Sequence, residues 1–76
     1  MENILEKNKY HREIKPHVWV DVYDVLEAFE VRNSAVQHAL KKLLAPGQRG
    51  AKSTVQDLEE AILSINRAIE LEKEWE

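Results

Sequence analysis

Apolar residues spaced three and four positions apart constrain this chain more than any other feature of its sequence. The clearest set lies in its last third, at Val55, Leu58, Ile62, Ile65 and Ile69. Alternating steps of three and four return to one face of an α-helix and make up heptad spacing. The sequence therefore predicts a long helix that begins at Ser53 or Thr54 and runs to about Glu72.

The same spacing predicts two helices further upstream. The first follows Asp21, whose carboxylate can accept hydrogen bonds from amides of a first helical turn. Its apolar face consists of Val22, Val25, Leu26 and Phe29. The second begins at Asn33 or Ser34 and ends at Pro46-Gly47, since proline and glycine stop helices. Its apolar face consists of Val36, Ala39, Leu40, Leu43 and Leu44.

The beginning of the chain carries weaker signals. Residues 1–16 are mostly polar and predict a leader that closes at Pro16, and residues 17–74 predict a single helical domain. The run His17-Val18-Trp19-Val20 favours a brief extended segment, because β-branched and aromatic residues suit extended backbone. We expect an all-α fold: a short first helix plus a long antiparallel helical hairpin.

Chain length predicts self-association. A chain of 76 residues buries only about 60% of its unfolded surface, so small folds of this size often need extra stabilisation. The chain has no cysteine, and its three histidines form no spaced metal pair, so we expect neither disulfides nor a metal. A homo-oligomer is the remaining expectation. Ala61, Ala68 and Leu71 lie beside the heptad stripe and suit either a second subunit or a wide internal core.

Charge is distributed unevenly along the chain. The net charge is −3, but no acidic residue lies between Glu30 and Asp57. Five basic residues occupy that interval: Arg32, Lys41, Lys42, Arg49 and Lys52. A basic centre between acidic ends predicts a localised anion site. It argues against sequence-specific DNA binding, because acidic flanks repel the phosphate backbone.

The basic loop is the predicted ligand site. Free amides at a helix start carry partial positive charge and suit a phosphate group, and guanidinium and ammonium groups add charge-assisted hydrogen bonds. The candidate ligand-binding residues are Lys41, Lys42, Arg49, Gly50, Lys52 and Ser53, with His38 and Arg67 as secondary candidates. The alternative is structural, since lysines at a helix end complement its dipole. The string GQRGAKS lacks the glycine spacing of a phosphate-binding P-loop.

Acidic pairs suggest an enzymatic alternative. Asp24 with Glu27, and Asp57 with Glu60, lie one turn apart on two predicted helices. If the pairs face each other, they could hold Mg²⁺ for hydrolysis of a nucleotide phosphate anhydride. The competing interpretation is a solvated helix face, and capping also explains Asp57. We expect no catalytic residues.

The run HALKKLLAPGQRG at residues 38–50, followed by DLEEAI at 57–62 and Asn66-Arg67, resembles a family of small phage-encoded helical domains. In that family a helix of the type NAIKYLLRAGKKG leads into a helix of the type EDLKKAIWYLER. Such domains occur alone and attached to a podovirus nucleotide kinase. Lys42 occupies the family's tyrosine position, and Ala45-Pro46 replaces Arg-Ala. The resemblance implies an accessory of nucleotide metabolism.

Residues 64–69, SINRAI, are similar to the last helix of some phage sponge proteins, which capture cyclic nucleotide signals of host antiviral defence. That resemblance implies a non-enzymatic oligomeric binder of a phosphate-bearing nucleotide, with a cyclic nucleotide as the specific ligand and no cofactor. The alternatives are a phage protein–protein interaction module and an Mg²⁺-dependent all-α nucleotide pyrophosphohydrolase. No signal peptide or membrane span is evident, so we expect a cytoplasmic protein, in the host cytoplasm if phage-encoded.

Overall fold

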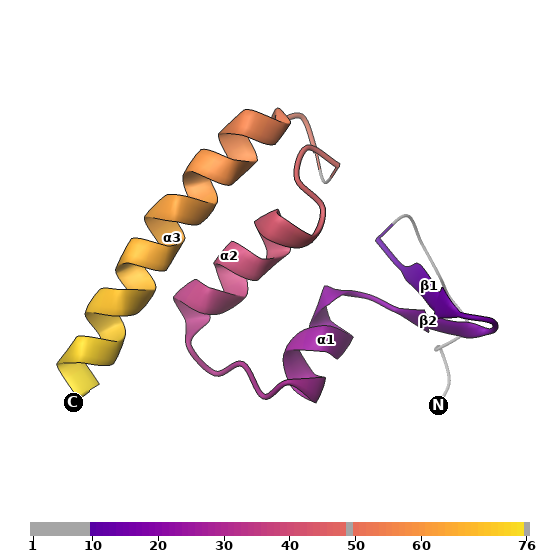
Figure 1. Ribbon diagram of the computed structural model, residues 1–76, viewed down its shortest axis with the longest axis horizontal. Coiled ribbons are helices and arrows are strands. Elements are labelled where there is room, and N and C mark those ends of the chain that lie inside the picture. Colours follow the sequence, from indigo (N-terminus) through magenta and orange to yellow (C-terminus); the bar gives the residue numbers. More distant parts are fainter. Residues whose placement is uncertain (1–9, 49, 76) are drawn as a thin grey trace.

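The computed structural model describes residues 10–48 and 50–75. Along them lie strands β1 (Arg12–Lys15) and β2 (Val18–Val20) and helices α1 (Val22–Ala28), α2 (Ser34–Leu44) and α3 (Thr54–Trp75). Figure 1 shows these elements as a row, with α3 beside α2, then α1, then the two strands. Among the described elements, α3 packs against α2 alone.

The prediction of an all-α chain is wrong, because β1 and β2 form an antiparallel ribbon ahead of the helices. Pro16 and His17 make the turn, with His17 at a φ of 66° and its amide donating to Glu13 Oε2 at 2.9 Å. The extended segment expected around Val18–Val20 is confirmed as β2. Every β1 residue is exposed, so that strand, within the predicted leader, lacks the apolar–polar alternation that reveals strands.

All three helices begin where capping side chains predicted. Asp21 and Asp24 exchange backbone-to-carboxylate hydrogen bonds of 3.0 and 2.9 Å at the start of α1. Asn33 Oδ1 accepts from two first-turn amides of α2, at 2.9 and 3.2 Å. Ser53 Oγ accepts from the Gln56 amide at 3.1 Å, one residue before α3. Local side-chain chemistry sets these boundaries.

The predicted hairpin of two long helices is also wrong, because α2 has 11 residues and α3 has 22. Pro46 cannot continue a helix, and Gly47 has a φ of 76°, so the chain leaves α2 after Leu44. A Cβ on Gly47 would collide with the Thr54 side chain, which shows how tightly the loop returns to α3. At 1.5 Å per residue, α2 spans about 16 Å and α3 about 33 Å, so α2 covers half of α3.

Small residues form the contact between α2 and α3. Ala39 on α2 and Ala61 and Ala68 on α3 are buried, and Asn33 Nδ2 donates to the Ala68 carbonyl at 3.2 Å. Of the two interpretations left open for Ala61 and Ala68, this packing supports the internal core. Of the large aliphatic residues of α3, Ile65 and Ile69 line a groove beside this contact, and Val55, Leu58 and Ile62 are 40–63% exposed.

Candidate functional site

Lys42 is the centre of an ionic cluster beneath the predicted basic loop. Its side chain is only 8% exposed, and its Nζ lies 2.7 Å from Glu60 Oε1 and 3.7 Å from Asp57 Oδ1. A buried ammonium group requires such partners, because its desolvation is otherwise costly. We call Lys42, Lys52, Asp57 and Glu60 the Lys42 cluster. The cluster contains two cations and two anions and is therefore balanced in charge.

Glu60 joins both lysines. Lys52 Nζ donates to its two carboxylate oxygens at 2.8 and 3.0 Å, while Lys42 approaches from the buried side. Hydrogen bonds from Lys42 and then Lys52 lower the pKa of the Glu60 carboxyl from 4.5 to about 2. Glu60 therefore stays ionised at neutral pH and competes with any external anion for these two cations.

Asp57 attaches the loop to α3. Its Oδ2 accepts from the Gly47 amide at 2.6 Å, and its own amide donates to the Ser53 carbonyl at 3.0 Å. The capping role expected of Asp57 is thus replaced by a bond across the loop. Because Asp57 is buried, its carboxylate stabilises both the loop and Lys42.

A polar pocket of about 220 Å³ adjoins this cluster and is lined by Lys42, Gly50, Ala51, Lys52 and Asp57. The structure thus brings together three predicted ligand residues, Lys42, Gly50 and Lys52, next to the cap Ser53. Arg49 lies outside the described residues. An anion entering the pocket would meet the Asp57 carboxylate together with the two ammonium groups.

The other predicted ligand residues interact with different partners. Lys41 Nζ lies 4.9 Å from the centre of the Tyr23 ring in a cation–π contact. His38 Nδ1 lies 2.9 Å from Ser64 Oγ on α3. Arg67 lies 2.9 Å from Glu70 and 3.7 Å from Glu74 on the solvent side of α3. None of these three lines the polar pocket.

The acidic pairs proposed for Mg²⁺ also have other partners. Asp24 belongs to the capping box of α1, and Glu27 lies 3.9 Å from Arg32. Asp57 and Glu60 are bound to lysines. Across residues 10–48 and 50–75, no three His, Cys, Asp or Glu side chains gather as a metal-binding group.

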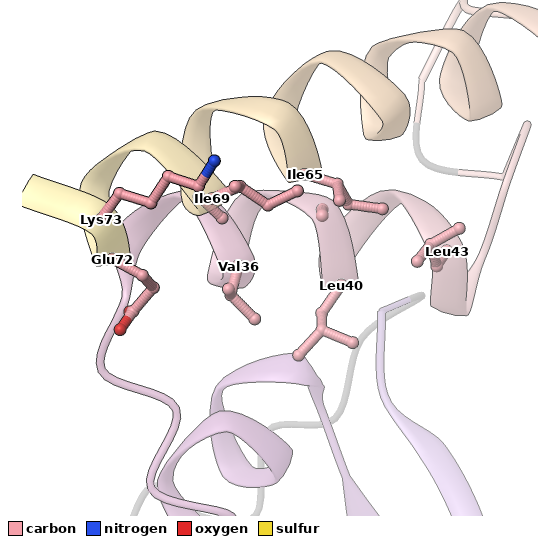
Figure 2. A pocket seen from close by; sticks show the side chains of 9 residues that line it. Val36, Leu40, Leu43, Ile65, Ile69, Glu72 and Lys73 are labelled. Atoms are coloured by element: carbon pink, nitrogen blue, oxygen red, sulfur yellow. The ribbon is translucent and has the colours of Figure 1, made fainter. Parts of the chain in front are cut away.

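A second candidate site is an apolar groove of about 510 Å³ between α2 and α3. We call it the α2–α3 groove; Figure 2 shows Val36, Leu40 and Leu43 from α2 and Ile65 and Ile69 from α3 along it, with Glu72 and Lys73 at one end. Sequence reasoning missed this groove because it assigned both apolar faces to an internal hairpin core. The heptad spacing was the signal that pointed to it.

The heptad seam consists of Val55, Leu58, Ile62, Ile65 and Ile69, and the described residues cover it only in part. The exposed fractions of these five residues run from 40% at Leu58 to 63% at Val55. Single exposed apolar residues are ordinary, but a continuous stripe of them marks an interaction surface. The small residues Ala61 and Ala68 face α2 in its place.

None of the helices in the described ranges combines the length and the apolar character needed to cross a membrane. Comparison with protein families, with curated proteins and with solved structures finds no match for this chain. The ionic cluster and the apolar groove are the features of the described residues that bear on function.

Proposed function

We propose that the chain is a non-enzymatic protein–protein interaction module whose α2–α3 groove and heptad seam bind an amphipathic helix. One observation carries this proposal: five aliphatic residues in heptad register remain 40–63% exposed along one side of α3. Helix-in-groove recognition uses apolar anchors at this spacing.

The free energy available on this face is substantial. Complete burial of one large aliphatic side chain contributes about 1.5–3 kcal/mol, so covering the exposed half of five gains roughly 5 kcal/mol before association costs. The buried apolar residues within one copy, Leu26, Ala39, Ala61 and Ala68, are mostly small. A docked helix would supply the large aliphatic core that the described residues of one copy do not form.

A matched pair of variants tests the proposal. Ile62 and Leu63 are adjacent on α3 and similarly exposed, at 59% and 68%, but only Ile62 belongs to the seam. A synthetic helix with the sequence of Thr54–Trp75 is added to the full chain while methyl NMR signals are followed. We expect saturable shifts at the groove. Ile62→Asp should weaken binding more than about tenfold, because a buried carboxylate is costly, and Leu63→Asp should change it less than about twofold.

Two results would overturn the module: no shift at any seam or groove methyl, or equal effects of the two aspartate variants. Equal effects would mean that the peptide associates with α3 without regard to its face.

Nucleotide binding is the second candidate function, favoured by the polar pocket that Lys42, Gly50 and Lys52 share. The ligand proposed is a cyclic nucleotide captured in the host cytoplasm, as the resemblance to phage sponges implies. The phosphate of this ligand would replace Glu60 as the ion-pair partner of Lys52. The Lys52 side chain is half exposed and therefore accessible to it. Calorimetry with cyclic di- and trinucleotides tests it: Lys52→Ala should weaken binding at least tenfold, and Lys73→Ala should leave it unchanged. Heat-released ligand should be intact.

A further inference from the structure

We propose that the helix bound on this face is α3 of a second copy of the chain, running antiparallel to the first. This proposal rests on the interaction module proposed above and names its partner. The heptad seam spans 15 residues of α3 and lies beside Ala61 and Ala68, which are buried against α2, and its Ile65 and Ile69 also line the α2–α3 groove. A surface with this periodicity is complementary to itself.

The register follows from the heptad positions. Val55, Ile62 and Ile69 occupy the a positions, and Leu58 and Ile65 occupy the d positions. In an antiparallel pair, a residues of one helix lie level with d residues of the other. Placing Ile62 level with Ile65 of the second copy brings Leu58 level with Ile69 of the second copy. This register places the last four seam residues of each helix, from Leu58 to Ile69, in apolar layers.

Charge decides the direction. The flank of the seam opposite Ala61 and Ala68 carries Glu59, Asn66 and Lys73, each seven residues from the next, and Lys73 also lies at one end of the α2–α3 groove. All three are exposed, and neither Glu59 nor Lys73 forms an ion pair with another described residue. In an antiparallel pair, these flanks meet, so Glu59 approaches Lys73 of the second copy and the two Asn66 residues lie nearest the axis. Two symmetric ion pairs result.

A parallel pair gives these charges no complement. The flank carrying Glu59 would then meet the other flank of the second copy, which consists of Thr54, Ala61, Ala68 and Trp75. None of these four residues is charged, and Ala61 and Ala68 are already buried. The antiparallel direction is the one that pairs the free charges and leaves the internal α2–α3 contact intact.

The absence of cysteine makes a cross-linking test clean. Leu58→Cys and Ile69→Cys are prepared in the full chain as single variants and then mixed under mild oxidation. A disulfide needs Cα atoms within about 7 Å. In the antiparallel register the two Leu58 positions are separated by about 16 Å along the axis, but Leu58 lies level with Ile69 of the second copy. We expect mass spectrometry to detect a disulfide-linked dimer of the two variants in the mixture. Each variant alone should remain uncrosslinked.

Cross-linking of each variant with itself would overturn the antiparallel direction, because only a parallel pair brings identical positions together. A chain that stays monomeric in sedimentation at millimolar concentration, with no mixed disulfide, would overturn the second copy as the occupant. If the synthetic helix still binds the groove in that case, the interaction module survives without self-pairing. If neither the mixed disulfide dimer nor binding of the synthetic helix is observed, the interaction module is also overturned.

Charge reversal provides an independent test. Glu59→Lys and Lys73→Glu should each weaken dimerisation on the order of tenfold, since each replaces two attractions with two repulsions. Combining both substitutions in one chain restores opposite charges and should return the Kd to within about twofold. Glu74→Lys, on the outer face of α3, is the matched control and should leave the Kd unchanged. Equal weakening by all four variants would contradict the proposed register.

Discussion

The two sides of α3 differ in how many of their side chains find a partner among the described residues. Toward the loop, the Lys42 cluster matches two lysines with two carboxylates, and Asp57 also bonds the Gly47 amide. Along the heptad seam, five large aliphatic residues have no such cover. A strongly charged segment can therefore be neutralised within the chain, while the apolar side chains of the heptad seam remain available to bind a partner.

This contrast favours binding of a protein helix over binding of an anion. A phosphate at the polar pocket must compete with carboxylates whose charges are already in place, whereas a helix in the α2–α3 groove displaces only water. Apolar burial is favourable without a specific partner atom, but an ionic contact is worth little when it replaces an equivalent one.

Lys42→Met should produce the largest effect on the ionic side. Both Lys42 and Asp57 are less than 10% exposed, so the substitution leaves a buried carboxylate without its cation. We expect the free energy of unfolding, from urea titration, to fall by about 3 kcal/mol. Lys41→Met is the control and should cost less than about 1 kcal/mol. Dimerisation of the folded fraction should be unchanged, and a lost dimer with retained stability would break the comparison.

Ile69→Ala should produce the complementary effect on the apolar side. Because Ile69 is 48% exposed in one copy, its truncation should lower the unfolding free energy of the dilute chain by about 1 kcal/mol. At concentrations where the chain associates, the loss should grow, since two symmetric truncations then remove contacts. Unfolding measured across a concentration series separates the two contributions. A loss that does not depend on concentration would place Ile69 outside any interface.

Acid pH should weaken the Lys42 cluster. The folded-state pKa of Glu60 is lowered from 4.5 to about 2, so its stabilising contribution is complete above pH 4.5. That contribution is lost as the pH falls from 4.5 towards 2. We expect the Tm to decline over this window, and the decline should be smaller in Glu60→Gln. An identical decline in both proteins would assign the acid sensitivity to other carboxylates.

Lys52→Ala should have the smallest effect. Lys52 is half exposed, and Glu60 keeps its contact with Lys42 after the substitution. A loss of about 0.5 kcal/mol in unfolding free energy is expected. NMR titration should show the pKa of Glu60 rising toward its ordinary value, because one of its two lysine partners is gone. An unchanged pKa would show that Lys42 alone controls this carboxylate.

The helix boundaries were predictable because their causes are local. Asp21, Asn33 and Ser53 cap helices through hydrogen bonds that reach only two or three residues along the chain. The extended segment of β2 was predicted, but β1 and its pairing with β2 were not, since every residue of β1 is exposed and the strand carries no burial pattern. Its pairing depends on the turn at His17, whose φ of 66° is uncommon for a residue other than glycine.

The sequence by itself determined three helices, their caps, the stop at Pro46-Gly47 and the heptad spacing of α3, because each depends on neighbouring residues. Only the tertiary structure decided which of two adjacent lysines is buried: Lys42 turns toward Asp57 and Glu60, while Lys41 lies over Tyr23. It also decided that Ala61 and Ala68 are buried against α2, while the residues of the heptad seam beside them stay 40–63% exposed. Both outcomes depend on the rotation of one helix against another, which contacts distant in sequence control.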